Sequence, residues 1–332
     1  MASETASSLV QDFQNLSWVM RSPSLLKDFS GIPVSDAECL KWWNPSASML
    51  AQLEKDPEPL REYLDHHRRS GRLGNLFEVL IRFWLEGLLG VRELAQGVAI
   101  REGGETRGEL DFIFRFPETA IIQHWEVAVK FFMCIAETPD GAQQMDHFVG
   151  QALVDRLDRK LALSIQKQLP LIRDPQAREV LKQLGFYGEI QSRLFFKGRL
   201  FYPLKWKWRE VLGPIEVSAQ HERGWWLAWG GRQSLEQLHE YESQVSWKSS
   251  ERAWVTLGKE RWMGLVEEGS ESGSLLDDER LFSFLEQHFT SERGAIQLAR
   301  VYRSEDGRWR EPTFSSGMGR GMILGPGWPH SV

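Results

Sequence analysis

Asp111, Glu126 and Lys130 lie within one mostly apolar stretch, residues 108–131 (GELDFIFRFPETAIIQHWEVAVKF). The stretch reads as two β-strands joined by a turn at residues 117–119, because apolar residues dominate both halves and a proline separates them. Side chains alternate between the two faces of a strand, so folding at this turn allows Asp111 and Glu126 to converge. Lys130 shares the face of Glu126. A buried sheet accepts such charges only where they pair with one another or hold a metal ion.

These residue types suit the metal-assisted hydrolysis of a phosphodiester. Carboxylate oxygens are the ligands that Mg²⁺ (or Mn²⁺) prefers, so Asp111 and Glu126 are candidate metal ligands. Lys130 would position the attacking water or stabilise charge on the phosphate. Glu78, on a predicted helix, would complete the catalytic and metal-binding set, with a solvated pair to Arg82 as its alternative. Glu126 and Lys130 could likewise be ordinary ion-pair partners.

The pattern resembles the PD-(D/E)XK nuclease superfamily, in which a helix glutamate precedes a strand aspartate and a strand (D/E)-X-K motif. It also resembles a bacterial family called domain of unknown function 1853, which has been grouped with that superfamily. The resemblance implies a restriction-endonuclease-like core and Mg²⁺-dependent cleavage of DNA. The residues that carry it are LGNLFE (73–78), GELDFIF (108–114), HWEVAVKFF (124–132) and GQALVDRLDRKL (150–161). One position departs from the pattern, since Ala128 stands two residues before Lys130, where the superfamily has its second acid.

Four more polar residues are candidates for supporting the metal site. Glu109 shares a strand face with Asp111, although it could equally begin the strand in water. The apolar spacing predicts a long helix that begins near Asp146 or Val149 and ends at Gln168. The resemblance implies that this helix directs a polar group into the site, whereas the alternative is a charged outer face with i,i+4 pairs. The candidates on this helix are Gln151, Asp155 and Lys160.

A basic and aromatic run, residues 193–209 (RLFFKGRLFYPLKWKWR), contains six Lys and Arg residues and no acidic one. Basic side chains can neutralise phosphates while aromatic rings stack on bases, so the run predicts contact with nucleic acid. The alternative is an ordinary sheet with a solvated basic face. We expect two strands here, separated by a turn at Lys197 and Gly198. The candidate nucleic-acid contacts are Arg193, Lys197, Arg199, Lys205, Lys207 and Arg209.

The composition limits the class of protein. The chain has 40 Lys and Arg against 46 Asp and Glu, a net charge of −6, so nucleic acid could be bound only by a local basic patch. No run of about 18 apolar residues predicts a transmembrane helix. The N-terminus lacks the features of a signal peptide. We therefore expect a cytoplasmic protein that is not bound to a membrane, with Cys39 and Cys134 reduced and buried.

The chain of 332 residues predicts an α/β (α+β) protein with a central mixed sheet flanked by helices. We expect an N-terminal helical segment (1–70), a nuclease-like core (71–188) and a mainly β, Trp-rich region (189–332), which could belong to the same domain. The clearest predicted helix spans residues 72–89. The favoured function is that of a DNA nuclease. The alternatives are an inactive nuclease-fold scaffold that binds nucleic acid or protein, and a hydrolase of small phosphoesters.

Overall fold

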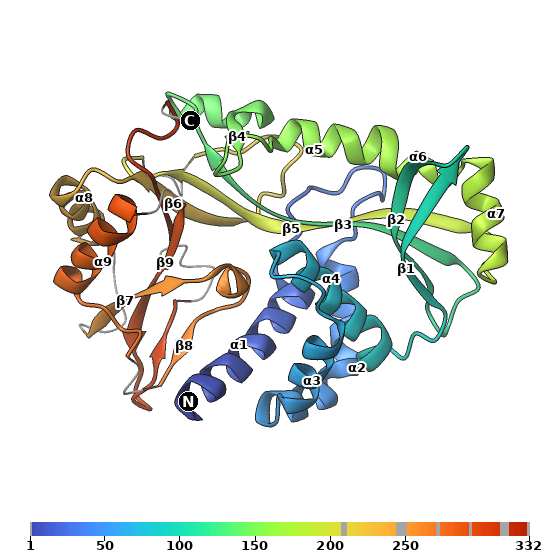
Figure 1. Cartoon of the computed structure of the whole chain (residues 1–332), viewed down its shortest axis with the longest axis horizontal. Coiled ribbons are helices and arrows are strands. Elements are labelled where there is room, and N and C mark those ends of the chain that lie inside the picture. Colours follow the sequence, from blue (N-terminus) through green and yellow to red (C-terminus); the bar gives the residue numbers. More distant parts are fainter. Residues whose placement is uncertain are drawn as a thin grey trace.

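A large mixed β-sheet extends along the computed structural model of the protein (Figure 1). The structure describes residues 2–206, 211–243, 251–269, 273–291, 294–312 and 319–330. The strands in these ranges are β1 (Leu94–Glu102), β2 (Glu105–Arg115), β3 (Ile122–Cys134), β4 (Phe148–Val149), β5 (Ile190–Pro203), β6 (Glu222–Ala228), β7 (Arg252–Leu257), β8 (Glu267–Glu268), β9 (Ile296–Arg303), β10 (Trp309–Arg310) and β11 (Arg320–Leu324). Their order is β1-β2-β3-β5-β6-β11-β9-β10-β8, with β4 paired to β3 and β7 to β9.

Helices cover both faces of this sheet, which confirms the predicted mixed α/β fold. The α-helices of the described ranges are α1 (Ala2–Arg21), α2 (Asp36–Lys55), α3 (Glu58–His67), α4 (Leu73–Phe83), α5 (Leu157–Leu163), α6 (Leu169–Leu171), α7 (Pro175–Gln183), α8 (Arg232–Ser243) and α9 (Asp278–Ser291). Helices α1–α4 lie below the sheet in Figure 1, α5 and α6 lie above it, and α7 stands at its right-hand end beside β1 and β2. The C-terminal region, predicted as mainly β, contains α8 and α9 beside its strands. No described helix has the length and apolar character needed to cross a membrane.

The helix predicted at residues 72–89 is confirmed as α4, which continues into the π-helical turn η1 (Trp84–Leu88). Its apolar stripe, which includes the fully buried Leu80, packs against β2, β3 and β5. Phe77 stacks on Phe195 of β5 with ring centroids 5.9 Å apart. This packing fixes the helix on the sheet and leaves Glu78 half-buried at the border of the stripe.

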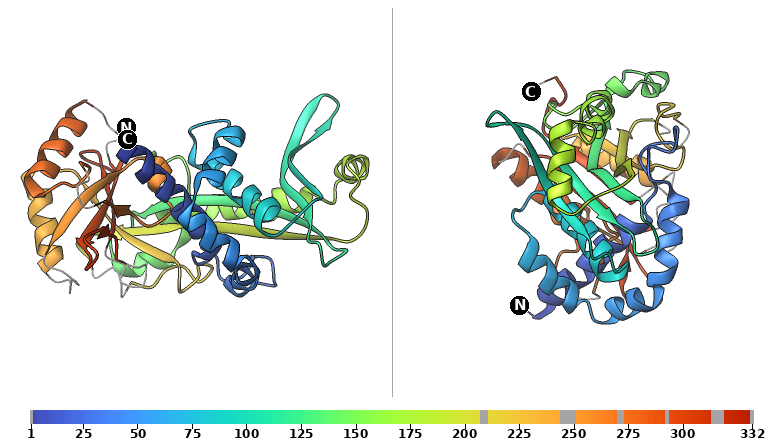
Figure 2. Two further views of the ribbon diagram at one scale, coloured as in Figure 1. Left: turned by 90° about the horizontal axis from the view of Figure 1, so that it is seen from below. Right: turned by 90° about the vertical axis from the view of Figure 1, so that its right-hand side faces the viewer.

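The predicted hairpin is confirmed as the antiparallel pair β2–β3, but the two strands separate partway along. Pairing runs from Arg115 opposite Ile122 to Phe112 opposite Trp125 and then stops. Beyond this point β2 remains paired with β1, and the β1–β2 hairpin stands out from the rest of the fold (Figure 2, left). On this edge of β3, pairing resumes at Met133, opposite β4. Between these two points no described strand covers this edge of β3.

Strand β5 is continuous, so the predicted turn at Lys197 and Gly198 is wrong. Residues Ile122 to Met133 of β3 pair in parallel with Ile190 to Phe201 of β5. A Cβ atom on Gly198 would lie 1.9 Å from the carbonyl oxygen of Lys130. The glycine is therefore required by the close approach of two central strands and not by a change in chain direction.

The predicted long helix begins later than expected. Residues 148–149 form β4, and a loop follows in which Leu153 has a φ of +58°. The helix starts at Leu157 and passes through a π-helical turn, η4 (Ser164–Gln168), into α6. The loop places Gln151 and Asp155 outside the helix, and only Lys160 of the three candidates is helical. Both cysteines, Cys39 and Cys134, are free and buried, as predicted.

Candidate metal-binding site

Asp111 and Glu126 meet at the point where β2 and β3 separate. Each is the chain neighbour of a residue in the last pair of the two strands, Phe112 opposite Trp125. In place of a strand-to-strand hydrogen bond, the backbone N–H of Val127 donates to Oδ2 of Asp111 over 2.9 Å. Glu126 is only 1% exposed, and its Oε2 atom has no hydrogen-bond partner among the described residues. The separation of the strands thus leaves two neighbouring carboxylates with a free, buried ligand atom.

The electrostatics of this pair favour a bound proton or cation. Burial and the nearby charge of Glu126 raise the pKa of Asp111 to about 8, against the opposite effect of the Val127 amide. The charge of Glu78 contributes in the same direction as burial. Metal-free Asp111 therefore retains its proton to a higher pH than an ordinary aspartate does. A divalent cation at this position would replace that proton, because it offers more positive charge to both carboxylates.

The lysine beside these carboxylates comes from the helix and not from the strand. Lys160 Nζ of α5 lies 3.0 Å from Oε1 of Glu126. Ser164, one helical turn later, donates a hydrogen bond of 3.2 Å to the same oxygen. The small side chain of Ala128, on the same face of β3 as Glu126, packs with Leu157 of α5 in one apolar cluster. The side chain of Lys160 remains 21% exposed, whereas that of Glu126 is 2% exposed.

Glu78 lies near this pair without joining it. It is half-buried, and burial raises its pKa, while a hydrogen bond of 3.3 Å from Nε2 of Gln96 acts in the opposite direction. The charge of Glu126 also raises the pKa of Glu78, so the two carboxylates are within electrostatic reach. Its alternative partner Arg82 pairs instead with Glu86 over 3.1 Å. Glu78 is therefore neither a solvated partner of Arg82 nor in contact with the pair.

Two carboxylates suit Mg²⁺ or Mn²⁺, which commonly bind through one or two protein carboxylates together with water and phosphate oxygens. The unpaired Oε2 of Glu126 and the raised pKa of Asp111 fit such a cation. Across the described part of the chain, no group of three Asp, Glu, His or Cys residues is close enough to share a metal ion.

Glu109 is exposed on β2, near Gly97 of β1. The residues that converge are thus Asp111, Glu126 and Lys160.

Three of the predicted site residues gather at a different place. Lys130 Nζ pairs with Oδ2 of Asp155 over 2.7 Å. Lys130 lies four residues after Glu126, roughly 13 Å along the strand, so its ammonium group is not placed beside that carboxylate by the strand itself. Lys130, Asp155 and Gln151 line a cavity of about 320 Å³.

Most of the basic run is buried, which corrects its predicted role in binding nucleic acid. Arg193 pairs with Glu38 over 2.7 Å, and Arg199 pairs with Glu222 over 2.6 Å. Lys197 donates to the backbone oxygen of Ser22 and is 1% exposed. These three cations stabilise contacts inside the fold and cannot reach a phosphate on the surface. Lys205 is exposed just after β5, whereas Lys207 and Arg209 lie outside the described residues.

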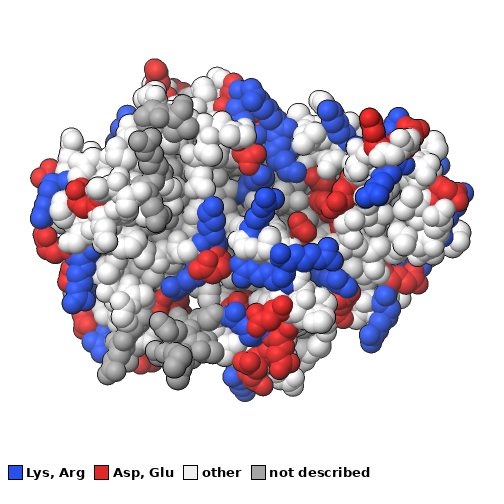
Figure 3. All heavy atoms as spheres, in the orientation of Figure 1, with Lys and Arg blue, Asp and Glu red and all other residues white. Residues whose placement is uncertain are grey.

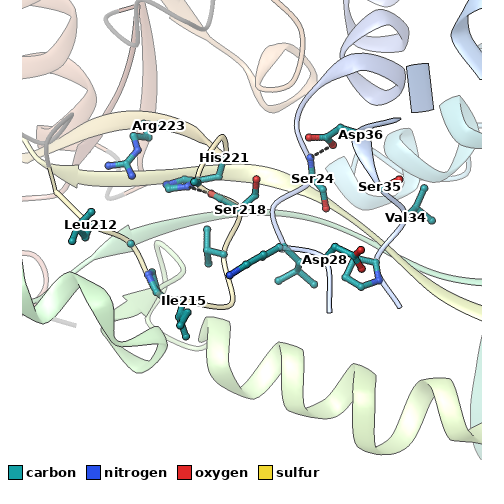
Figure 4. Close-up of a pocket in the computed structure, with 17 residues that line it drawn as sticks. Ser24, Asp28, Val34, Ser35, Asp36, Leu212, Ile215, Ser218, His221 and Arg223 are labelled. Atoms are coloured by element: carbon teal, nitrogen blue, oxygen red, sulfur yellow. Dashed lines mark hydrogen bonds between the residues drawn. The ribbon is translucent and has the colours of Figure 1, made fainter. Parts of the chain in front are cut away.

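A second cavity, of about 530 Å³, lies between the loop after α1 and the loop before β6 (Figure 4). His221 borders it and is held on both ring nitrogens: Nδ1 donates to the carbonyl oxygen of Ser218 over 2.6 Å, and Nε2 accepts from the hydroxyl of Tyr202 over 2.9 Å. Burial lowers the pKa of His221 to about 4, so the imidazole is neutral. No local sequence pattern indicates this cavity, because its walls come from segments nearly 200 residues apart, 24–36 and 212–223.

The fold and this site define a mixed α/β protein with a buried carboxylate pair where two strands of its sheet separate. The chain matches a family model described as "Domain of unknown function (DUF1853)" over residues 14–323 and therefore belongs to that family. No curated protein and no solved structure matches the chain.

Proposed function

We propose that this protein is a Mg²⁺-dependent phosphodiesterase of the PD-(D/E)XK nuclease type, with a restriction-endonuclease-like core and DNA as the favoured substrate. The observation that carries the proposal is the Asp111–Glu126 pair with Lys160 bound to Glu126. Two adjacent carboxylates and one lysine are the groups needed to bind a divalent cation beside a phosphate.

Each residue has a distinct part in this proposal. Asp111 and Glu126 would hold the cation, which when bound would polarise the phosphate and lower the pKa of a water molecule. Ser164 and Lys160 orient Glu126 through its Oε1 atom, which leaves Oε2 for the cation. The partly exposed ammonium of Lys160 would stabilise negative charge on the phosphate. Glu78, at a greater distance, would bind water that surrounds the cation.

The surface charge supports a substrate that carries phosphates. Lys and Arg side chains gather over the middle of the face shown in Figure 3, with acidic side chains beside them. Arg69 is exposed before α4, and its positive charge lowers the pKa of Glu78. Arg72 and Arg159 are also exposed, at the starts of α4 and α5. Local positive charge on the surface is what a chain of net charge −6 needs to attract nucleic acid.

Calorimetry with MgCl₂ and MnCl₂ tests the metal site directly. Wild type should bind either cation, and Asp111→Asn should not. Asp140→Asn, which makes the same change at an exposed position of a 3₁₀ turn, should bind like wild type. Cleavage assays then use single-stranded DNA, duplex DNA and the small phosphoester bis(p-nitrophenyl) phosphate. Wild type and Asp140→Asn should cleave, and Asp111→Asn should not. If Asp111→Asn cleaves as fast as wild type, the proposed site is wrong.

The second candidate is an inactive nuclease-fold protein that binds nucleic acid or another protein. Two observations favour it: Ala128 at the usual acid position, and the lack of a third close ligand within the described ranges. Binding of DNA in EDTA, with no cleavage after addition of Mg²⁺ or Mn²⁺, would identify this candidate. Cleavage that depends on both the cation and Asp111 would exclude it.

A further inference from the structure

The open edge of β3 forms a path from the carboxylate pair to a cavity. The N–H of Val127 points to this edge, because it donates to Asp111 there. Backbone groups alternate sides along a strand, so those of Val129 and Phe131 point the same way. No described strand covers them before Met133 pairs with β4. The path ends in the cavity of about 320 Å³ that both Val129 and Phe131 line.

Aromatic rings form one wall of this cavity. Phe131 and Trp262 meet edge to face, with ring centroids 5.6 Å apart. The indole N–H of Trp262 is fixed by a hydrogen bond of 3.1 Å to the carbonyl of Leu257, and the ring is 5% exposed. Met133 and Met322 complete the apolar lining. A flat ring entering this space would stack on one aromatic face and meet the edge of the other.

The polar groups of the cavity are not all satisfied within the protein. Oε1 of Gln151 is buried and has no hydrogen-bond partner among the described residues, although the backbone oxygen of Gln151 accepts from the indole of Trp328 over 3.0 Å. A buried acceptor without a donor is costly, so a rotation of this amide that turns Oε1 toward a hydrogen-bond donor in the cavity would be favoured. The Lys130–Asp155 ion pair is partly exposed, so breaking it to let Lys130 bind a ligand costs little free energy.

We propose that this cavity binds one unpaired nucleobase with an exocyclic amino group, from a single strand that follows the edge of β3 to Asp111 and Glu126. This inference rests on the proposed nuclease function and narrows its substrate to single-stranded or locally unpaired nucleic acid. The amino group donates to Gln151 Oε1, the ring stacks on the partly exposed Phe131, and Lys130 contacts the strand. A base inside a duplex is stacked and paired and cannot enter the cavity.

Fluorescence anisotropy in EDTA tests this inference without cleavage, with labelled oligo(dC), oligo(dT) and a duplex of mixed sequence as probes. Wild type should bind oligo(dC) more tightly than oligo(dT), because cytosine has the amino group, and should bind the duplex least. Gln151→Leu should reduce oligo(dC) affinity about tenfold, to the level of oligo(dT). Ala152→Trp, at an exposed position of the cavity rim, should weaken both single strands about tenfold by filling the space. Gln183→Leu, exposed at the end of α7, is the matched control and should change neither.

Binding of all three probes that is unchanged in both cavity variants would overturn the inference, as would duplex bound as tightly as oligo(dC). If wild type in that case still cleaves DNA with Mg²⁺ and Asp111→Asn does not, the proposed function stands and only the cavity assignment fails. If instead the cavity variants weaken single-strand binding but Asp111→Asn cleaves like wild type, the proposed function fails and the cavity assignment stands. Absence of binding to every probe overturns the cavity assignment.

Discussion

Lys160 Nζ lies 3.0 Å from Oε1 of Glu126, although the two residues are 34 positions apart in the chain. Lys130, on the same strand as Glu126, instead pairs with Asp155 at the 320 Å³ cavity. The lysine that accompanies the carboxylates is therefore supplied by a helix that packs on the sheet. Lys160 therefore lies beside the carboxylates and Lys130 beside the cavity. Variants of each lysine can separate an effect on cleavage from an effect on substrate binding.

Lys160→Met should reduce kcat for DNA cleavage by roughly 10²–10³-fold, because it removes a charge that stabilises the phosphate. Lys130→Met should mainly raise KM, since Lys130 lies at the cavity and away from the carboxylates. Steady-state cleavage kinetics in Mg²⁺ with a single-stranded substrate measure both constants. Equal loss of kcat in the two variants would contradict this assignment.

Asp111→Asn should change how the stability of the metal-free protein depends on pH. The pKa of Asp111 is raised from 3.8 to about 8, so the folded state retains a proton that the unfolded chain releases. The stabilisation is complete below about pH 4 and is lost as the pH rises through about 8. The variant should lack this loss and be more stable than wild type at pH 8.5. Urea unfolding in EDTA at pH 5 and pH 8.5 measures the difference in the free energy of unfolding. If the variant is less stable than wild type at both pH values, Asp111 is instead a structural partner of the Val127 amide.

His221→Gln should make the protein less sensitive to acid. Burial lowers the pKa of His221 from 6.5 to about 4, so the unfolded chain binds a proton that the folded state excludes. This part of the stability is complete above about pH 6.5 and is lost as the pH falls toward 4, on the order of 3 kcal/mol in all. Glutamine can still bond to Tyr202 and Ser218 but does not titrate. Between pH 7 and pH 4.5, the melting temperature of the variant should therefore decrease less than that of wild type, as measured by thermal unfolding.

Gly198→Ala should destabilise the protein by more than about 3 kcal/mol or prevent its folding, because the added Cβ would lie 1.9 Å from the carbonyl oxygen of Lys130. Gly74→Ala is the matched control, since no atom lies within 4 Å of its Cβ position in α4. Alanine at position 74 should be neutral or stabilising by up to about 1 kcal/mol, because alanine favours helices. Denaturant unfolding of the two variants measures the contrast. Similar stability of both would show that β3 and β5 are farther apart than described.

Local sequence patterns were sufficient to predict the elements that carry the carboxylates. The i,i+3,i+4 spacing of apolar residues predicted the helix of Glu78, and the two apolar runs around Pro117 predicted the β2–β3 hairpin. Because strand side chains alternate faces, these runs also predicted that Asp111 and Glu126 converge. Such features depend on residues close together in the chain, where the period of the pattern directly reflects the backbone geometry.

The partners of the charged side chains were decided only by the tertiary structure. The sequence predicted that Arg193 and Lys197 contact nucleic acid at the surface. In the fold they contact Glu38 and the carbonyl of Ser22, which are 155 and 175 residues away in the chain. Lys160 reaches Glu126 only because the helix starts at Leu157 and packs with Ala128 of β3 in one apolar cluster. A charge is stabilised by whatever opposite charge or donor lies within a few ångströms, and that distance is set by how helices and strands pack, which no local pattern specifies.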